Sequence, residues 1–308
     1  MISATARSGG AATIVNAIST GKGAAFGIDL ETRASVELRD TDSVTALLDN
    51  GEDGTLVETA VKKVLELFDY EKGAIVKTES TIPIAKGLKS SSAAANATVL
   101  ATFGALAKKY GRIRSLRLSK LVSRQQIEIG GEQIQDDLVL KLSVEAAKEA
   151  GVTVTGALDD AAASYYGGFA VTDNGLGEVK RKGELEDMPV ILFVPEEKTY
   201  TADIDVQKTK TFYRELEMLW ETALKGDLYT AMTLNGMVYS AALGANQEIA
   251  NAAMQAGALA GGLSGTGPAV AVLIKKDGDP DKVLSALSAF KGKTIQTRVN
   301  NQKAKIVE

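Results

Sequence analysis

The sequence predicts an α+β fold with two lobes, and three observations support this. The chain has 308 residues, which is long enough for two lobes of ordinary size, each with its own core. Strand patterns and helix patterns both occur in each half of the chain, without an internal repeat. From Phe169 onward, strands flank a series of long helices, which is typical of an α+β sandwich. We therefore expect an N-terminal lobe over residues 1–168 and a C-terminal lobe over residues 169–308.

The composition excludes several kinds of chemistry. The chain has no cysteine and no histidine, which rules out a thiol nucleophile, a disulfide and a histidine general base. Acid or base catalysis would fall to Asp, Glu, Lys or Tyr. Mg²⁺ is the natural metal, because a bound metal would have to be hard and oxygen-bound.

Charge and hydropathy limit the partners. The net charge of −4 gives no electrostatic reason to expect nucleic acid or an anionic membrane as a partner. No apolar run approaches the length of a membrane span, and the first residues lack a basic and apolar leader. We expect a cytoplasmic protein with a small-molecule substrate and without a nucleic-acid or membrane partner, and we leave a homodimer open.

The first 70 residues predict strands and then a helix. Small and β-branched residues alternate around several glycines over residues 1–40, which predicts two or three strands joined by a glycine turn. Apolar residues recur at helical spacing from Leu56 to Phe68 and predict an amphipathic helix. Four polar residues of the strands are available to a cleft: Ser8, Thr13, Asn16 and Lys22. Each of them is about as well explained as an ordinary hairpin residue.

A loop with serine, glycine and lysine follows a strand-like segment, Ala74–Glu79, and opens an alanine-rich helix that runs to about Lys108. A helix start offers unbonded N–H groups and the positive end of the helix dipole, which together attract anions. Three hydroxyls and two ammonium groups there suit a nucleotide polyphosphate with Mg²⁺. The alternative is that Ser90–Ser92 only cap the helix. The P-loop and dinucleotide fingerprints are both absent, so a phosphate site here belongs to another architecture.

The middle of the chain predicts two helices separated by a loop. Basic and apolar residues interleave from Arg112 to Arg124, which favours an amphipathic helix with a solvated positive face over an anion-binding patch. Residues 125–137 are poorly patterned and predict a loop. Residues 138–150 predict a helix that ends at Gly151.

A second informative stretch contains the paired carboxylates Asp159 and Asp160. A short strand over Val152–Thr155 ends at a glycine, and the two aspartates begin a brief alanine-rich helix. Adjacent side chains point in different directions, so we expect one aspartate to cap the helix and the other to face a cleft. The alternative is that both cap a helix on the surface.

The C-terminal half predicts strands and helices in turn. A third glycine loop, Gly261–Pro268, runs into an apolar strand, Ala269–Ile274. Glycines at positions 226 and 244 are expected to end helices. The expected elements are strands at 169–171 and 190–194, helices at 205–225, 227–243 and 246–260, then a helix at 280–290 and a strand at 293–299.

Three loops in this order resemble those of the GHMP kinase superfamily, which includes galacto-, homoserine, mevalonate and phosphomevalonate kinases. Gly87–Ala93 resembles the central ATP-phosphate motif of that superfamily, and Leu263–Pro268 resembles its C-terminal glycine motif. Asp160 lies seven residues before Gly167, where mevalonate kinases and galactokinases carry their catalytic aspartate. The resemblance covers nearly the full chain. It implies a two-lobed GHMP kinase fold, with a ribosomal protein S5 domain 2-like N-terminal lobe and a ferredoxin-like C-terminal lobe.

Within the superfamily the chain is most similar to the archaeal-type shikimate kinases, through residues 12–17, 20–27, 87–92 and 151–157. A glycine-glutamate-histidine triplet of several sister kinases is missing, which counts against a galactokinase or a mevalonate kinase. The resemblance implies ATP-dependent phosphorylation of shikimate to shikimate 3-phosphate, a step of aromatic amino-acid biosynthesis. Two alternatives stay open: a homoserine or pantoate kinase of the same fold, and a sensor that binds nucleotide and metabolite without turnover.

The resemblance also implies residues for nucleotide and metal binding. The backbone of Lys86–Ser92 would hold the triphosphate, with Ser91 reaching Mg²⁺ and Lys89 screening phosphate charge. Glu145 or Glu149, one helical turn apart, would complete the metal site. The cofactor-binding residues are then Lys86, Gly87, Leu88, Lys89, Ser90, Ser91, Ser92, Gly265, Thr266 and Gly267, the last three closing on the transferred phosphate.

For the acceptor, the resemblance implies one catalytic residue and a polar pocket. Asp160 would accept or orient the proton of the attacking alcohol. Shikimate is a carboxylate with three hydroxyls, so its pocket should offer a cation and several hydrogen-bonding groups. Arg7 and Arg298 are as reasonable for the carboxylate as the N-terminal residues. Those residues, expected to bind the substrate, are Ser8, Thr13, Asn16 and Lys22.

Overall fold

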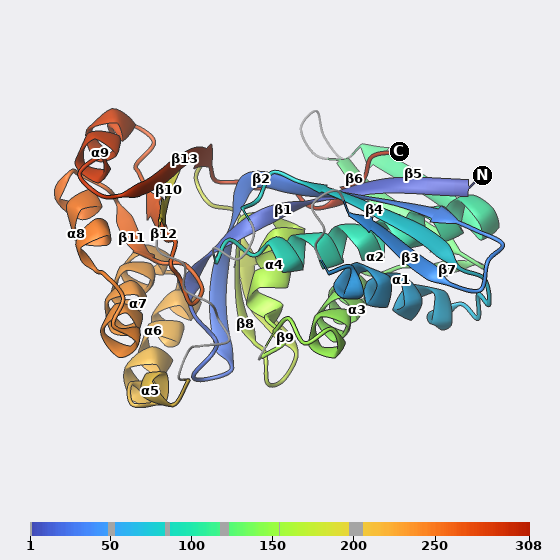
Figure 1. The fold of residues 1–308 in the computed structure, drawn as a ribbon, viewed down its shortest axis with the longest axis horizontal. Coiled ribbons are helices and arrows are strands. Elements are labelled where there is room, and N and C mark those ends of the chain that lie inside the picture. Colours follow the sequence, from blue (N-terminus) through green and yellow to red (C-terminus); the bar gives the residue numbers. More distant parts are fainter. Residues whose placement is uncertain (1, 49–52, 84–86, 118–122, 154, 197–205) are drawn as a thin grey trace.

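The computed structural model describes residues 2–48, 53–83, 87–117, 123–153, 155–196 and 206–308, and these form two lobes that each contain a β-sheet (Figure 1). The α+β class predicted from the sequence is confirmed. The strands in these ranges are β1 Ile2–Val15, β2 Lys22–Leu38, β3 Val44–Leu48, β4 Ala74–Ser80, β5 Gly111–Arg117, β6 Ser123–Ile129, β7 Glu132–Gln133, β8 Phe169–Asp173, β9 Glu178–Gly183, β10 Pro189–Pro195, β11 Ala260–Leu263, β12 Val270–Leu273, β13 Gly292–Arg298 and β14 Lys305–Ile306. The helices are α1 Thr55–Leu67, α2 Ser90–Tyr110, α3 Asp136–Glu149, α4 Leu158–Tyr166, α5 Val206–Lys210, α6 Tyr213–Lys225, α7 Leu228–Leu243, α8 Glu248–Gln255 and α9 Pro280–Leu287.

A long antiparallel hairpin, β1 with β2, connects the two lobes. Its open end packs in the N-terminal core, where Ala4 and Val36 are buried in one cluster with residues of α1 and α2. Its closed end packs in a second core, where Ile14 and Phe26 are buried together with residues of α6, α7 and β10. The hairpin therefore carries its turn, residues 16–21, to the junction between the lobes.

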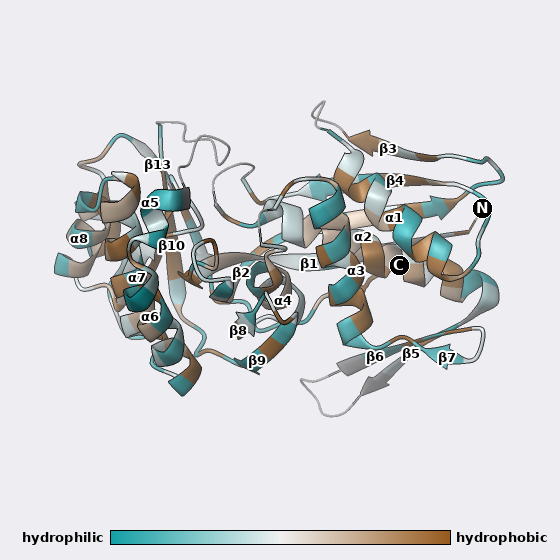
Figure 2. Cartoon of the chain, turned by 90° about the horizontal axis from the view of Figure 1, so that it is seen from below, coloured by the Kyte–Doolittle hydropathy of each residue, from teal (hydrophilic) through white to brown (hydrophobic). Residues whose placement is uncertain are grey.

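The N-terminal sheet has strand order β14-β1-β2-β4-β3, and β8 joins it by pairing with β2. Helices α1, α2 and α3 lie next to one another across this sheet (Figure 2). Helix α2 is the central one, since nearly every residue from Ala93 to Ala107 is buried. Its many alanines permit this close packing against both the sheet and the neighbouring helices.

The boundary predicted after Gly168 does not coincide with the change of sheet. Strand β8 pairs with β2 over Phe169–Asp173, and β9 pairs with β8, so both strands extend the N-terminal sheet. The C-terminal strand β14 returns to this sheet as well and pairs with β1. The end of a lobe depends on which distant strands pair, and the local composition of the sequence does not show that pairing. The second sheet begins at β10.

The C-terminal sheet has the strand order β11-β12-β10-β13, and every pairing in it is antiparallel. Along the chain the strands and helices follow the order strand, helices, two strands, helix, strand. This is the ferredoxin-like arrangement that the resemblance implies. Helices α8 and α9 cover one face through Ile249 and Val283, while α6 and α7 pack on the other face.

The helix predicted from Arg112 to Arg124 is wrong for 112–117 and 123–124, and residues 118–122 lie outside the described residues. The loop predicted over 125–137 is also wrong. Both stretches contribute to a small antiparallel sheet, β5-β6-β7. Pairing with β6 over the whole of β5, from Gly111 to Arg117, makes this stretch a strand. The first residue of β5 is Gly111, where a side chain would collide with β6, because a Cβ there would lie 1.9 Å from the carbonyl oxygen of Glu128.

The other helices follow their predicted patterns closely. Helix α1 buries the apolar face that begins at Leu56, and α3 ends with Gly151 in the left-handed region at φ 69°. Gly226 and Gly244, also left-handed, end α6 and α7 as predicted. One predicted helix is divided, since 205–225 contains both α5 and α6. Helix α8 is shorter than predicted because Gly257, left-handed at φ 104°, ends it after Gln255.

Candidate active site

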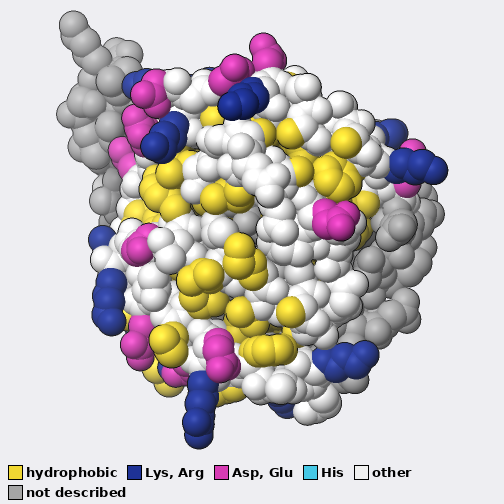
Figure 3. All heavy atoms as spheres, turned by 90° about the vertical axis from the view of Figure 1, so that its left-hand side faces the viewer, with side chains coloured by type: hydrophobic (Ala, Val, Ile, Leu, Met, Phe, Trp, Pro, Cys, Tyr) yellow, Lys and Arg dark blue, Asp and Glu magenta, His cyan; other side chains and the backbone are white. Residues whose placement is uncertain are grey.

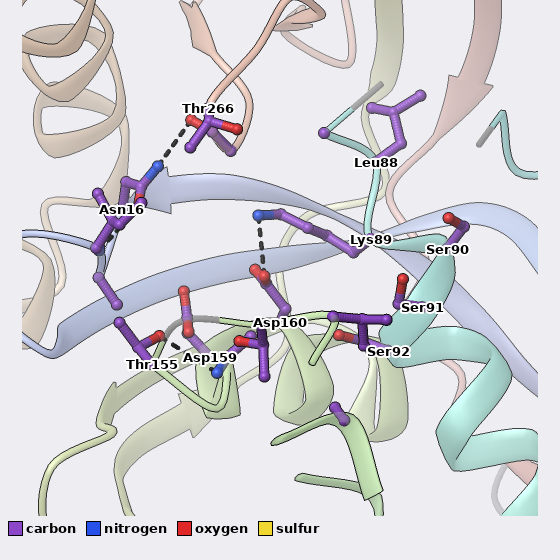
Figure 4. Close-up of a pocket in the computed structure, with 18 residues that line it drawn as sticks. Asn16, Leu88, Lys89, Ser90, Ser91, Ser92, Thr155, Asp159, Asp160 and Thr266 are labelled. Atoms are coloured by element: carbon purple, nitrogen blue, oxygen red, sulfur yellow. Dashed lines mark hydrogen bonds and ion pairs between the residues drawn. The ribbon is translucent and has the colours of Figure 1, made fainter. Parts of the chain in front are cut away.

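The three loops singled out in the sequence meet at one cavity of about 210 Å³ (Figure 4). It lies where the β1–β2 turn, the start of α2 and the start of α4 approach one another. Ser91, Asp160 and Thr266 all line it, so the predicted convergence of the loops is observed. Lys86 lies outside the described residues.

Helix α2 begins at the cavity without a capping side chain. Its N-cap residue is Lys89, and Ser90, Ser91 and Ser92 lie in the first turn instead of at the cap. Among the described residues, none accepts a hydrogen bond from the N–H of Ser91 or Ser92, and the first bonded amide is that of Ala93. A 21-residue helix therefore presents bare N–H groups and the positive end of its dipole to the cavity, which suits a phosphate group.

Two left-handed residues shape the loop before α2. Gly87 has φ 76° and Lys89 has φ 64°. A side chain at Gly87 would collide with the third loop, because a Cβ there would lie 2.1 Å from the carbonyl oxygen of Ser264. Leu88, between them, is buried in the core that both lobes share. The loop is thus fixed from two sides, while its lysine side chain is left to reach into the cavity.

Lys89 and Asp160 form an ion pair across the cavity, with Nζ 2.9 Å from Oδ2 (Figure 4). Both side chains are nearly buried. Burial and, to a smaller extent, the negative charge of Asp159 raise the pKa of Asp160 to about 7, although Lys89 acts in the opposite direction. The other carboxylate oxygen of Asp160, Oδ1, is buried and has no hydrogen-bond partner among the described residues. We expected Lys89 to screen phosphate charge, and in the structure it pairs with the carboxylate of Asp160.

Both aspartates at the start of α4 line the cavity, so the prediction that one of them caps the helix is wrong. The N-cap residue is Ala157, and no side chain caps α4. Asp159 accepts a hydrogen bond at 2.9 Å from Nδ2 of Asn174, at the end of β8. Val152 and Thr153, expected in a strand before the helix, lie in a loop along the cavity wall.

The third glycine loop is bonded to β1 and to the serine loop. The N–H of Gly265 donates to Oγ1 of Thr13 at 2.8 Å, and that of Gly267 donates to the carbonyl oxygen of Ser264. Both amides, which we expected to bind the transferred phosphate, are thus already used within the protein. Gly265 and Thr266 line the cavity, whereas Gly267 does not.

Of the four predicted substrate residues, only Asn16 lines the cavity. Its Nδ2 donates to the carbonyl oxygen of Gly265 at 2.7 Å. Ser8 is buried against Ser164 of α4, and Thr13 holds the third loop. Lys22 forms an ion pair with Glu217 at 2.9 Å. Each of these three side chains is instead bonded to another part of the protein.

The two arginines considered for a carboxylate are also paired elsewhere. Arg7 forms an ion pair with Glu31, and Arg298 forms one with Asp187. Neither arginine lines the cavity. Lys89 is therefore the one cationic side chain among the described residues of the cavity wall.

Of the three residues predicted to bind the metal, one lies at the cavity and two do not. Ser91 lines the cavity, but Glu145 and Glu149 do not. Glu149 forms an ion pair with Lys63 of α1 at 2.7 Å, and the negative charge of Glu145 also raises the pKa of Lys63. Both glutamates therefore face α1. Within the described ranges, no cluster of three or more Asp, Glu, His or Cys side chains could hold a metal. Their spacing in the sequence places both glutamates on one face of α3. It does not show whether that face lies toward the cavity or toward α1.

Sequence reasoning missed two residues of α7 that hold the β1–β2 turn. Oδ1 of Asn235 accepts from the N–H of Asn16 at 3.1 Å, and the hydroxyl of Tyr239 donates to the carbonyl oxygen of Asn16. Burial raises the pKa of Tyr239 to about 12, so it stays a neutral donor. The available signal was two polar side chains four residues apart in a helix without charged residues.

Two family models match the chain. One is described as GHMP kinases N terminal domain and matches residues 55–168, and the other as GHMP kinases C terminal and matches residues 221–293. Among solved structures, a homoserine kinase from Cytophaga hutchinsonii has a TM-score of 0.72 at 18% identity, covering 100% of this chain and 98% of its own. A mevalonate kinase from Methanococcus jannaschii has the same TM-score and identity, and the match covers 96% of this chain and 98% of that kinase. The fold and these matches define a GHMP kinase, an enzyme that uses ATP to phosphorylate a small molecule.

More similar relatives narrow the family. A protein named shikimate kinase from Methanothermobacter thermautotrophicus is 39% identical over 100% of this chain and 99% of its own length. Another protein named shikimate kinase, from Methanothrix thermoacetophila, is 43% identical over 96% of this chain and 94% of its own length. The chain therefore belongs to the archaeal-type shikimate kinase family of GHMP kinases. In the described ranges, no helix combines the length and the apolar character needed to cross a membrane.

Proposed function

We propose that this chain transfers the γ-phosphoryl group of ATP to a hydroxyl of shikimate and forms shikimate 3-phosphate. One observation carries the proposal: the uncapped N-terminus of α2 and the buried carboxylate of Asp160 face the same cavity. The first suits a nucleotide phosphate, and the second suits the proton of an attacking alcohol. The full-length relatives named shikimate kinase support shikimate as that alcohol.

The residues of the cavity divide the work. Phosphoryl transfer depends mainly on positioning and charge neutralisation, and the N–H groups of Ser91 and Ser92 provide both for the phosphate oxygens. Asp160 accepts the proton of the acceptor hydroxyl through its unpartnered oxygen, Oδ1. The hydroxyl oxygen bonds to the γ-phosphorus as the bond to the ADP oxygen breaks. Lys89 favours the ionised form of Asp160, which is the form that accepts a proton.

Mg²⁺ neutralises phosphate charge when it binds together with ATP. The hydroxyl of Ser91 is a hard oxygen donor on the cavity wall, at the helix end where we place the phosphates. Mg²⁺ in nucleotide sites commonly takes most of its other ligands from phosphates and water, so one protein hydroxyl fits this pattern. We keep Ser91 as its proposed ligand and withdraw Glu145 and Glu149, which face α1.

An assay of ADP release against a panel of alcohols tests the acceptor. We expect turnover with shikimate and none with homoserine or pantoate, and phosphorus NMR should place the new phosphate on the oxygen at carbon 3. Turnover of homoserine without turnover of shikimate would overturn the choice of acceptor. Nucleotide binding without turnover of any alcohol would favour the sensor alternative.

A homodimer, a cytoplasmic location and the absence of a nucleic-acid partner also stay predictions. The outer surface of the C-terminal lobe supports a homodimer, since hydrophobic side chains gather there in several groups (Figure 3). In this lobe Leu234 and Met237 of α7 are 43% and 42% exposed. Light scattering after gel filtration would measure the mass of the particle, and cell fractionation would measure its location.

A further inference from the structure

A second carboxylate faces the cavity, and the proposed phosphoryl transfer does not use it. Asp159 is 3% exposed and lies next to Asp160 at the start of α4 (Figure 4). Its Oδ1 accepts a hydrogen bond from Asn174, but none of the described residues donates to its Oδ2. A buried carboxylate with one neutral donor is costly to keep, so the fold leaves a strong acceptor without a protein partner.

The fold makes room for this carboxylate at Gly23 of β2. A Cβ at Gly23 would lie 2.5 Å from Oδ2 of Asp159 and 2.9 Å from Cβ of Ala17. Gly23 is not among the residues with positive φ, so its backbone does not require glycine. The missing side chain is explained by the carboxylate that occupies the space.

The position of Asp159 is set by Asn174 and the residues around it. Oδ1 of Asn174 accepts from the hydroxyl of Thr172 at 2.7 Å, which directs its amide nitrogen toward Asp159. The N–H of Asn174 donates to the carbonyl oxygen of Gly21 and ties it to the β1–β2 turn. A neutral amide therefore orients Asp159, and within the described ranges no cation pairs with it, whereas Lys89 pairs with Asp160.

These contacts specify what the free oxygen can bind. An anionic phosphate would be repelled by an unpaired carboxylate, whereas a neutral hydroxyl would donate a strong hydrogen bond to it. The two carboxylates are adjacent in sequence and line one cavity, so they reach neighbouring parts of one bound molecule.

We propose that Asp159 accepts a hydrogen bond from the acceptor hydroxyl next to the one that is phosphorylated, and thereby selects alcohols with neighbouring hydroxyl groups. The inference rests on the proposed function, in which Asp160 contacts the reacting hydroxyl. For shikimate the neighbouring group is the hydroxyl at carbon 4.

The test compares shikimate with an analogue that lacks the hydroxyl at carbon 4. For the wild-type chain, we expect the analogue to have a kcat/KM about 10- to 100-fold lower, as for the loss of a hydrogen bond to a charged group. The isosteric variant Asp159→Asn keeps the acceptor for Asn174 but presents a donor to the substrate. It should lose a similar factor with shikimate and treat the two substrates alike, with the KM for ATP unchanged.

Two further variants make the result decisive. Gly23→Ala places a methyl group where Oδ2 lies and should abolish the discrimination even if Asp159→Asn fails to fold. Asp187→Asn, in an exposed ion pair, should discriminate as the wild type does. Full discrimination by Asp159→Asn, or a loss that falls on Mg²⁺ or ATP affinity, would overturn this inference alone. Absence of any turnover of shikimate by the wild-type chain would overturn the proposed function and this inference with it.

Discussion

At the scale of single residues, Asp160 shows how the fold converts a weak base into a useful one. A carboxyl with its ordinary pKa of 3.8 has little tendency to take a proton from an alcohol at neutral pH. Burial and the charge of Asp159 raise the pKa of Asp160 to about 7, despite the opposite effect of Lys89. A base with a pKa near the working pH combines availability with strength.

The pH profile of the reaction follows from this value. Below pH 7 Asp160 is mostly protonated and cannot accept a proton, so kcat/KM should fall about tenfold per pH unit on the acid side and level off above pH 7. Asp160→Asn should lower kcat by about 10²- to 10⁴-fold and remove this limb, while ATP affinity measured by calorimetry is retained. An acid limb that survives in this variant would assign the titration to another group.

Lys89→Met tests the influence of the cation on the same titration. Without the ammonium group the ionised form of Asp160 loses its nearest stabilising charge, so its pKa rises and the acid limb of kcat/KM moves to higher pH. At pH 7 we expect about 10- to 100-fold lower activity, from the loss of a charge-assisted hydrogen bond. Lys89→Arg keeps the charge and serves as the control. An unchanged profile in Lys89→Met would limit Lys89 to phosphate binding.

At the scale of elements, the serine loop depends on the conformation of Gly87 and on its contact with the third loop. Gly87→Ala adds two costs: a left-handed alanine, at about 1–2 kcal/mol, and a collision with the carbonyl oxygen of Ser264. Gly177 is a matched control, since it is also left-handed, at φ 70°, but a Cβ there meets nothing within 4 Å. Gly87→Ala should therefore lower the Tm more than Gly177→Ala and also raise the KM for ATP. Equal effects would mean that the loop contact contributes nothing.

Local patterns in the sequence were sufficient where an element depends on its own residues. The helix from Leu56 to Phe68 and the glycine that ends α3 could be predicted because periodicity and a left-handed end are local properties. The basic stretch after Gly111 has too few residues to separate a period of two from a helical one, and its partner strand β6 decided the outcome. Propensity is weak where pairing supplies most of the stabilisation.

At the scale of the whole molecule, the cavity is assembled from contacts between distant parts of the chain. Thr13 binds the amide of Gly265 across 252 residues, and Ser264 binds the carbonyl of Gly87 across 177. The order of the three loops in the sequence predicts that they meet. It does not predict that the third loop uses the amide of Gly265 to hold β1, or that Glu149 pairs with Lys63 on α1. Such partners depend on the relative orientation of whole elements.

Ser264 is the residue at which these contacts join. It is fully buried, its hydroxyl donates to the carbonyl oxygen of Gly87 at 2.7 Å, and it accepts from the N–H of Thr13 at 3.3 Å. Ser264→Ala leaves the buried N–H of Thr13 and the half-buried carbonyl oxygen of Gly87 without this partner, at a cost of about 1–3 kcal/mol for the buried N–H and less for the carbonyl. We expect a Tm lower by several degrees together with a raised KM for ATP, because the same hydroxyl orients the loop before α2.

The two effects of Ser264→Ala should respond differently to ligand, which separates a local role from a structural one. Saturating ATP binds only the folded chain and raises the Tm of any variant that still binds it. If Ser264 joins the lobes at the nucleotide site, the rise in Tm at a fixed ATP concentration should be smaller in Ser264→Ala than in the wild type. Ser288→Ala, which removes an exposed hydroxyl bonded to the carbonyl oxygen of Ser285, should show the full rise. An equal rise in all three proteins would show that the hydroxyl supports the fold without shaping the site, and the junction between the lobes would then owe its geometry to Thr13 and Asn16.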